Sequence, residues 1–241
     1  MRAILFDLDG TLLDIDLGGF LRTYFGALGA ATQDRYPGID VLGAILASTA
    51  RMQATHPGMT NREAFNADFL QRTDLDLDAD EHARVFDDFY RVVFPTLGHG
   101  YGPAKGARRA VTTAMELGLP VVIATQPIFP RAAIEHRLAW AGLTDLGLQD
   151  LTTYELMHAC KPQPEYFREA AAMAGHTPAD CLMVGDDRAL DMPATDTGMR
   201  TFYTGTGSVA SADWSGDLDD LSDLLPRLVT DDASARRDAV S

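Results

Sequence analysis

The feature that constrains the fold most strongly is the alternation of short apolar runs with helical segments after residue 97. Residues 121–124 and 182–184 are β-branched or apolar runs of the kind that lie buried in parallel sheets. Residues 150–153 and 200–203 are weaker strand candidates. Strands that alternate with helices in this way predict an α/β fold with a doubly wound parallel sheet, which is a Rossmann-like core.

The helices between these strands have clear boundaries in the sequence. One is expected to begin near Pro130 and to end before Gly142, and another to begin near Pro164 and to end before Gly175. Proline suits the first turn of a helix because its missing N–H is not needed there, and glycine suits the position beyond the end. Both segments are therefore predicted to connect strands of the sheet.

Residues 14–96 show a different pattern, in which no strand stands out. Aromatic side chains recur there at helical spacing, at Phe20, Tyr24, Phe25, Phe65, Phe69, Phe86, Phe89, Tyr90 and Phe94. Such a pattern indicates the apolar face of packed helices and not an aromatic ligand site. We therefore predict a Rossmann-like core of residues 1–13 and 97–229, an inserted all-helical cap of residues 14–96, and a disordered tail at 230–241.

Charge and hydropathy exclude several classes of partner. The net charge is −15, and the chain has two lysines, Lys105 and Lys161. Proteins that bind nucleic acids or anionic membranes need clustered basic residues, so we expect neither partner. No segment approaches the roughly 18 uninterrupted apolar residues that a membrane helix needs. The N-terminus leads directly into a strand-like run without a signal core, so we predict a cytoplasmic location.

Four short polar motifs follow the predicted strands, at the positions where open α/β sheets bind ligands. The first is DLDGT at residues 7–11, directly after an apolar run. The two-residue period of a strand directs Asp7 and Asp9 to the same side, and carboxylates this close need a cation or a shared proton. The second is Thr125, a hydroxyl at the end of a predicted strand. Taken singly, these residues are equally explained as turn or helix-cap residues.

The remaining two motifs add a cation and more carboxylates. Lys161 lies in KPQP, a rigid segment that leads into a predicted helix. The sequence GDDRALD at 185–191 follows the apolar run that ends at Val184 and contains three aspartates. Three clustered carboxylates would repel one another unless a divalent metal or a lysine compensates their charge. A small phosphorylated substrate would need the same cations.

The four motifs in this order resemble the haloacid dehalogenase-like (HAD) hydrolase superfamily. The resemblance rests on DLDGT at 7–11, the apolar strand that ends in Thr125, Lys161 in KPQPEYF, and GDDRALD at 185–191. It covers nearly the whole chain, because subclass I of that superfamily places its helical cap where residues 14–96 lie. The resemblance implies a magnesium-dependent phosphatase that cleaves a phosphate monoester of a small metabolite.

The resemblance also implies a role for each motif residue. Asp7 is the nucleophile that forms an aspartyl-phosphate, and Asp9 protonates the leaving oxygen and then activates water. Mg²⁺ is held by the Asp7 carboxylate, the Asp9 backbone carbonyl and the Asp186 carboxylate. Thr125 and Lys161 bind the other phosphoryl oxygens.

The motifs depart from the usual pattern of the superfamily at two positions. Gln126 stands where asparagine is frequent, and Asp187 stands where a small polar residue is usual. The second departure leaves open whether Asp187 reaches the metal together with Asp186, and we expect Asp186 alone. Asp187 and Asp191 are expected to lie behind the residues that touch the metal and the substrate, where Asp191 orients Lys161 or a metal-bound water.

Other activities on the same fold remain alternatives at this point. A sugar-phosphate mutase shares the same core residues. A 2-haloacid dehalogenase is a further alternative, although it does not need the second acid that Asp9 provides. A phosphonatase uses a cap lysine, and residues 14–96 contain none. A non-enzymatic phosphate-sensing module is less well matched, because receiver domains are about half this length. The sequence specifies neither the substrate nor the oligomeric state.

Overall fold

A five-stranded parallel sheet forms the centre of the molecule. The computed structural model describes residues 1–240, with side chains up to Thr230. The strands lie in the order β4-β1-β5-β6-β7, and their bounds are β1 Ala3–Phe6, β4 Val121–Ile123, β5 Cys181–Gly185, β6 Arg200–Tyr203 and β7 Trp214–Ser215. The predicted strand at 150–153 is wrong, since Leu151 forms only an isolated bridge to Ile123 at the sheet edge.

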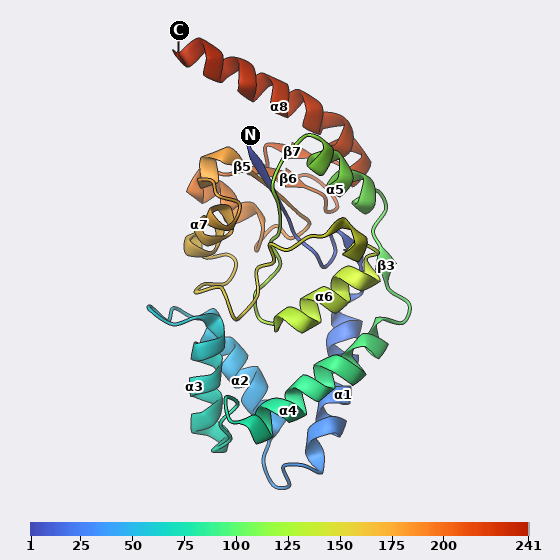
Figure 1. Ribbon diagram of the computed structural model, residues 1–241, viewed down its shortest axis with the longest axis vertical. Coiled ribbons are helices and arrows are strands. Elements are labelled where there is room, and N and C mark those ends of the chain that lie inside the picture. The colour runs from blue at the N-terminus through green and yellow to red at the C-terminus, as the bar shows by residue number, and fades with distance from the viewer. Residues whose placement is uncertain (241) are drawn as a thin grey trace.

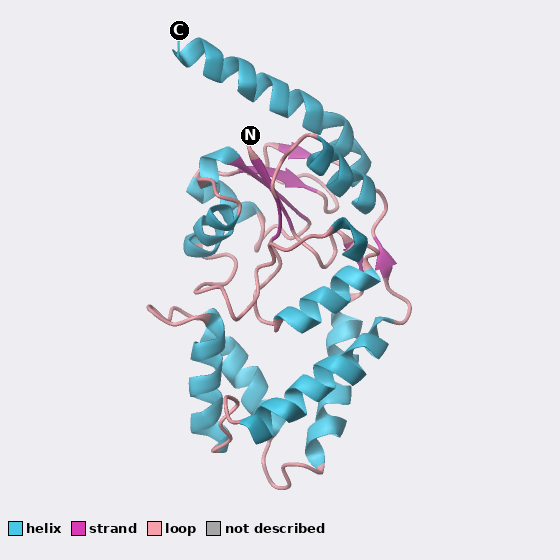
Figure 2. Cartoon of the chain, in the orientation of Figure 1, coloured by secondary structure: helices cyan, strands magenta, loops and turns pink. Residues whose placement is uncertain are grey.

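Helices cover both faces of this sheet, which confirms the predicted doubly wound α/β fold (Figures 1 and 2). One face packs on α7, Pro164–Met173, and the other on three helices: α5 Ala107–Glu116, α6 Arg131–Trp140 and α8 Leu218–Val240. Because side chains alternate along a strand, Leu5 belongs to the core on the α7 face and Ile4 to the core on the opposite face. Short 3₁₀ turns occupy Thr144–Leu146, Pro178–Asp180 and Met192–Thr197.

The predicted ends of α6 and α7 are confirmed. Pro130 is the N-cap residue of α6, and Pro164 is the first residue of α7. Gly142 and Gly175 have φ values of 66° and 73° just beyond these helices. This left-handed conformation is available to glycine without the steric penalty that a Cβ brings.

A second group of helices lies between β1 and the rest of the sheet in sequence, and below the sheet in Figure 1. These cap helices are α1 Leu17–Gln33, α2 Val41–Gln53, α3 Asn61–Thr73 and α4 Asp80–Asp88, followed by a π-helix, Phe89–Val93, and a 3₁₀ helix, Phe94–Gly98. The chain enters and leaves this part through an antiparallel pair, β2 Leu13–Asp14 and β3 Gly102–Pro103. That the two parts are separate domains stays a prediction.

The aromatic residues predicted from helical spacing pack the cap helices on the core. The rings of Phe20 and Phe94 are 5.8 Å apart, and Phe94 stacks on Trp140 of α6 at 5.4 Å. The rings of Phe20 and Tyr24 are 6.0 Å apart. Clusters of this kind are stabilised by burial and by favourable ring orientations.

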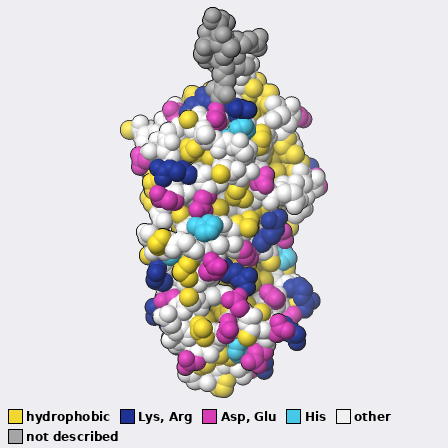
Figure 3. Space-filling model, turned by 60° about the vertical axis from the view of Figure 1, so that its left-hand side comes forward, with side chains coloured by type: hydrophobic (Ala, Val, Ile, Leu, Met, Phe, Trp, Pro, Cys, Tyr) yellow, Lys and Arg dark blue, Asp and Glu magenta, His cyan; other side chains and the backbone are white. Residues whose placement is uncertain are grey.

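The outer surface is charged, and both signs are interspersed on the face in Figure 3. On the cap helices several of these charges are paired across one turn, as in Arg72–Asp68 and Arg84–Asp80.

Among the described residues, none of the helices is long and apolar enough to cross a membrane. The backbone of α8 continues to Val240, whereas the side chains after Thr230 and all of Ser241 lie outside the described residues. The disordered tail at 230–241 and the cytoplasmic location therefore stay predictions.

Candidate active site

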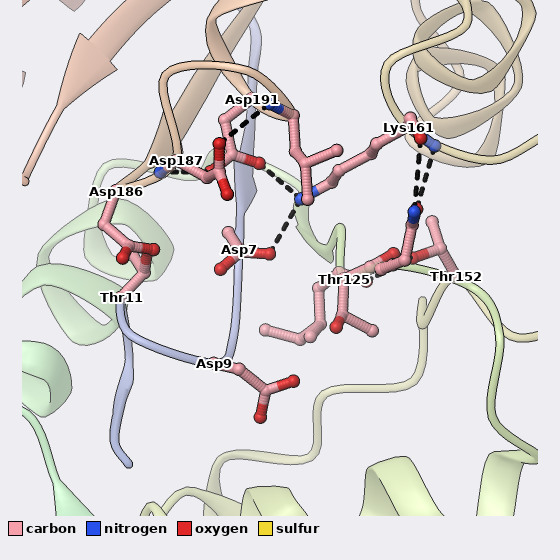
Figure 4. Close-up of polar contacts among 12 residues, drawn as sticks. Asp7, Asp9, Thr11, Thr125, Thr152, Lys161, Asp186, Asp187 and Asp191 are labelled. Atoms are coloured by element: carbon pink, nitrogen blue, oxygen red, sulfur yellow. Dashed lines mark hydrogen bonds and ion pairs between the residues drawn. The ribbon is translucent and has the colours of Figure 1, made fainter. Parts of the chain in front are cut away.

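The polar motifs meet at the carboxyl edge of the three neighbouring strands β4, β1 and β5. The Asp7 backbone N–H donates to the Val184 carbonyl at 2.8 Å, and the Ala124 N–H donates to the Phe6 carbonyl at 2.7 Å. These bonds continue the sheet register and align the ends of the strands. Figure 4 shows that Asp7 and Asp186 come from adjacent strands. Thr125 and Lys161 lie on the opposite side of Asp7 from Asp186. Residues grouped from their sequence motifs are therefore neighbours in space.

Lys161 forms the electrostatic centre of this group. Its Nζ donates to Asp7 Oδ1 at 2.7 Å and to Asp191 Oδ1 at 2.5 Å, and its side chain is only 2% exposed. Burial lowers the pKa of Lys161, but the charges of Asp191 and Asp7 outweigh burial and raise it overall. The lysine is therefore a permanent cation beside the predicted nucleophile.

Asp191 is fixed from two sides. Besides Lys161, it accepts the Asp187 backbone N–H on Oδ2 at 3.0 Å, and a Cβ on Gly185 would overlap its carboxyl group. Burial raises the pKa of Asp191 to about 7, although Lys161 lowers it. Asp187 itself is exposed, and its Oδ1 accepts the backbone N–H groups of Ala189 and Leu190 at 2.7 and 3.0 Å. The carboxylate of Asp187 thus stabilises the backbone turn formed by the residues that follow it.

A divalent metal fits the carboxylates on the other side of Asp7. Asp7, Asp186 and Asp191 each offer an oxygen, and these oxygens lie within 4.8 Å of one another. Burial and the negative charge of Asp7 raise the pKa of Asp186 to about 6. A cation would relieve this repulsion. Asp186 has no cationic partner among the described residues, whereas Asp7 and Asp191 both bond to Lys161, so Asp186 is the carboxylate that would gain most from a metal.

Thr11 and Gly10 position Asp186. The Thr11 hydroxyl donates to Asp186 Oδ1 at 3.0 Å, a contact that no sequence pattern predicted. Gly10 has φ 88°, and a Cβ there would lie 2.5 Å from Asp186 Oδ2. Only glycine allows the backbone of the first motif to approach the fourth this closely.

Asp9 is separate from this carboxylate cluster. Figure 4 shows its carboxyl group turned away from Lys161, and its Oδ2 accepts a short hydrogen bond from Arg137 Nη1 of α6. Burial raises the pKa of Asp9, Arg137 opposes this effect, and the nearby charge of Asp7 adds to it. The side chain of Asp9 is thus absent from the metal cluster, and metal binding through its backbone carbonyl stays a prediction.

Arg137 belongs to the site but was not predicted from the sequence. Its side chain is 1% exposed, and its guanidinium carbon lies 4.6 Å from the centre of the Phe129 ring. A signal was present, because Arg137 falls in the apolar stripe of Ala133, Ile134 and Leu138 on the buried face of α6. A charged residue at a core position of a helix rarely lacks a counter-charge.

Gln126 connects the loop after β4 to Lys161, and Thr125 is held by other residues. The Gln126 side chain accepts the Lys161 backbone N–H at 2.9 Å and donates to its carbonyl at 3.2 Å. The Thr125 carbonyl accepts hydroxyl hydrogen bonds from Thr152 at 2.7 Å and Tyr166 at 2.9 Å. Gln126, which departs from the usual asparagine, therefore fixes the backbone of Lys161 with two hydrogen bonds. Thr125 is buried at the edge of the site.

Comparison with protein families identifies the class of this protein. The family model described as haloacid dehalogenase-like hydrolase matches residues 1–195, and a second, described as HAD-hydrolase-like, matches residues 158–233. The chain therefore belongs to the haloacid dehalogenase-like hydrolase family, as the resemblance implied. It is a hydrolase by family. No curated protein sequence matches the chain closely enough to identify a relative.

Solved structures with the same fold include proteins of different activity. A HAD phosphatase from Thermococcus onnurineus is 21% identical, with a TM-score of 0.57 over 93% of this chain and 98% of that one. The L-2-haloacid dehalogenase from Xanthobacter autotrophicus is 18% identical, with 0.52 over 94% and 98%. The Bacillus subtilis HAD hydrolase YfnB, described as bound to magnesium, is 20% identical, with 0.51 over 93% and 98%. At these identities the likeness establishes the fold alone.

Proposed function

We propose that this protein is a magnesium-dependent phosphatase that hydrolyses a phosphate monoester of a small metabolite through an aspartyl-phosphate on Asp7. The observation that carries the proposal is the position of the Lys161 ammonium, 2.7 Å from Asp7, which itself belongs to a group of carboxylates with Asp186. A carboxylate is a poor nucleophile toward a dianionic phosphate because like charges repel. A fixed cation beside that carboxylate removes this obstacle.

Each side chain then has one task. Asp7 attacks phosphorus, the bond between phosphorus and the leaving oxygen breaks, and Lys161 and Thr125 bind the phosphoryl oxygens. Asp9 gives a proton to the leaving oxygen and later takes one from the water that hydrolyses the intermediate. Asp7 and Asp186, with the Asp9 carbonyl, would hold Mg²⁺, whose positive charge stabilises the charge on the phosphoryl oxygens.

The alternatives keep the same nucleophile and differ in the leaving group and in the acceptor of the second step. A mutase would return the phosphoryl group to a sugar, and a dehalogenase would displace halide without a proton donor. The buried Arg137–Asp9 pair favours the two activities that use Asp9, phosphatase and mutase, over the dehalogenase. Assays for free phosphate, isomerised sugar phosphate and free chloride distinguish the three reactions.

The decisive test is turnover of a panel of phosphate esters with Mg²⁺ and after exhaustive treatment with EDTA. We expect phosphate release with Mg²⁺, its loss on chelation and its return when Mg²⁺ is added back. Acid-quenched wild-type protein should carry a phosphoryl group that Asp7→Asn lacks. Full turnover after chelation would refute the metal assignment, and full turnover by Asp7→Asn would refute the nucleophile.

A further inference from the structure

A large cavity lies between the cap helices and the core segment 128–136. Its volume is about 890 Å³, which falls in the range of about 300–1,000 Å³ typical of small-molecule sites. The helices α1, α2, α3 and α4 all contribute side chains to its wall, and so do Ile128, Phe129 and Pro130 of the core. The cavity is therefore bounded on one side by the segment that directly follows Thr125.

The wall of this cavity is mainly apolar. The rings of Phe25, Phe65, Phe86 and Tyr90 line it and are only half-buried, and Leu46 is 53% exposed. Large apolar groups that face a cavity favour an apolar ligand, because they gain free energy when water leaves.

Several polar groups of the wall are already paired. The hydroxyls of Tyr24 and Tyr90 are 2.9 Å apart, and burial raises the pKa of Tyr24 to about 12. Arg62 forms an ion pair with Asp78, and Arg91 pairs with Asp88, each at 2.5 Å. Because most of the wall is apolar, a sugar with many hydroxyl groups would lose hydrogen bonds to water that the wall replaces only in part.

One layer of side chains lies between this cavity and the reacting centre, whose carboxylates are not part of the cavity wall. Phe129 lines the cavity and packs against the guanidinium of Arg137 at 4.6 Å, and Arg137 binds Asp9. Asp9 Oδ1 and Arg137 Nη2 are buried and have no hydrogen-bond partner among the described residues. Buried polar atoms without partners are rare in folded proteins, and a leaving-group oxygen would supply one here.

We propose that the cavity binds the organic group of the substrate and that this group is large and apolar, such as an alkyl chain or a fused aromatic ring. The inference rests on the proposed phosphatase activity and specifies its substrate class. The phosphoryl group lies at Asp7, the ester oxygen at Asp9 and Arg137, and the apolar group beyond Phe129.

A series of n-alkyl phosphates tests the proposal without a change in leaving-group chemistry, since ethanol, butanol and hexanol are similar leaving groups. We expect kcat/KM to rise by about two- to fourfold for each methylene added, as for a CH₂ group that leaves water. Glycerol phosphate and glucose 6-phosphate should be poorer substrates than hexyl phosphate. Equal kcat/KM across the alkyl series would overturn the inference while the phosphatase proposal stood.

Two exposed leucines of the cap helices provide a matched pair of variants. Leu46 of α2 is 53% exposed and lines the cavity, whereas Leu70 of α3 is 40% exposed and lies outside its wall. Leu46→Asp should abolish the dependence on chain length, because the charge disfavours an apolar neighbour. Leu70→Asp should behave like the wild type. The same response in both variants would overturn the inference.

Calorimetric binding of 2-naphthol to the metal-free protein gives a readout besides activity. We expect binding by the wild type and Leu70→Asp, and at least about tenfold weaker binding by Leu46→Asp, comparable to other losses in apolar pockets. If no ester is hydrolysed, the phosphatase proposal is refuted, and so is the assignment of the cavity to the ester's organic group. Binding of 2-naphthol that depends on Leu46 would still support the cavity as an apolar site. If 2-naphthol does not bind the wild type, the cavity assignment falls.

Discussion

The carboxyl edge of the sheet and the cavity among the cap helices are both ligand-sized sites, but they are built in opposite ways. At the sheet edge the buried groups are charged, and Lys161 alone bonds to two carboxylates. In the cavity the half-buried groups include aromatic rings, and the two arginines of the wall, Arg62 and Arg91, form ion pairs. Burying a charge is costly without a partner, whereas burying a ring needs none. The sheet edge therefore depends on the identity of a few residues, whereas the cavity depends on many side chains that need only be apolar.

This difference separates chemistry from selectivity. Replacing one residue at the sheet edge leaves a buried charge without its partner and should stop the reaction. Replacing one residue in the cavity should change which ester is preferred. Arg137 and Phe129 lie at the junction of the two regions, since one binds Asp9 and the other lines the cavity. Substitutions can test each side of this division and the junction between them.

The largest effect is expected from Lys161→Met, which removes the only cation bonded to Asp7 among the described residues. Methionine keeps much of the length of the side chain and deletes its charge. The loss in kcat/KM for phosphate esters should reach about 2–4 kcal/mol, or roughly 30- to 1,000-fold, as for other charge-stabilising groups in enclosed sites. Steady-state kinetics at saturating Mg²⁺ measures it, and vanadate should bind correspondingly weakly.

The second lysine of the chain is the control. Lys105 is 80% exposed and pairs with Asp217 and Asp219 at the surface. Exposed pairs of this kind contribute about 0–1 kcal/mol, so Lys105→Met should leave kcat/KM unchanged. Equal losses in both variants would mean that lysine content, and not the position of Lys161, determines activity. Unchanged vanadate affinity in Lys161→Met would remove the lysine from the site.

The same contrast explains what the sequence could predict. The parallel sheet, the ends of α6 and α7, and the grouping of Asp7, Lys161 and Asp186 follow from strand alternation, proline and glycine positions, and the rule that parallel strands place their carboxyl ends at one edge. Each of these signals is local in the sequence, so it is readable from one chain. The strand expected at 150–153 failed because only Leu151 bridges to β4.

Contacts across long sequence separations were not predictable in this way. Asp9 and Arg137 are 128 residues apart, and Thr11 and Asp186 are 175 apart. No periodicity encodes which buried charges meet once α6 packs on the sheet. The cavity is equally hidden, because the spacing of its aromatic residues is the same as that of residues in a filled core. Hydrophobic periodicity predicts which face is apolar and not whether that face is fully covered.

An intermediate effect is expected at the junction, from Arg137→Met. Without the guanidinium, Asp9 loses its hydrogen-bond partner and its fixed orientation. The loss in kcat should stay below the about 10²- to 10⁴-fold that general acid–base catalysis supplies, and it should be larger for hexyl phosphate than for p-nitrophenyl phosphate. The nitrophenolate leaves readily without a proton, whereas an alkoxide does not.

Arg137→Lys is the matched variant for this prediction. It retains the positive charge, although an ammonium does not reproduce the planar guanidinium, and it should recover part of kcat on hexyl phosphate. A thermal unfolding scan identifies any loss of folded protein, because removing one partner of a buried ion pair costs about 3–5 kcal/mol. Equal losses on both esters, without recovery by lysine, would assign Arg137 a purely structural role.

The smallest effect is expected where α3 of the cap contacts the core. The Asn61 amide is fully buried and donates to the carbonyls of Pro127 and Ala159 at 3.1 and 3.2 Å. Asn61→Ala leaves both carbonyls without this donor and should lower the free energy of unfolding by about 1–3 kcal/mol, measured by urea denaturation. The result should lie near the lower limit, because the substitution also removes Asn61 Oδ1, which is buried without a partner among the described residues.

Thr60→Ala on the preceding residue separates stability of the cap helix from its attachment to the core. Thr60 and Glu63 form a capping box at the start of α3, so its loss should also lower the unfolding free energy by about 1 kcal/mol. Only Asn61→Ala removes bonds to the loops after Thr125 and before Lys161, so only that variant should raise KM for hexyl phosphate. An equal rise in KM for both would show that the cavity depends on the stability of α3 and not on its attachment to the core. An unchanged KM in both would mean that the cavity does not depend on these hydrogen bonds.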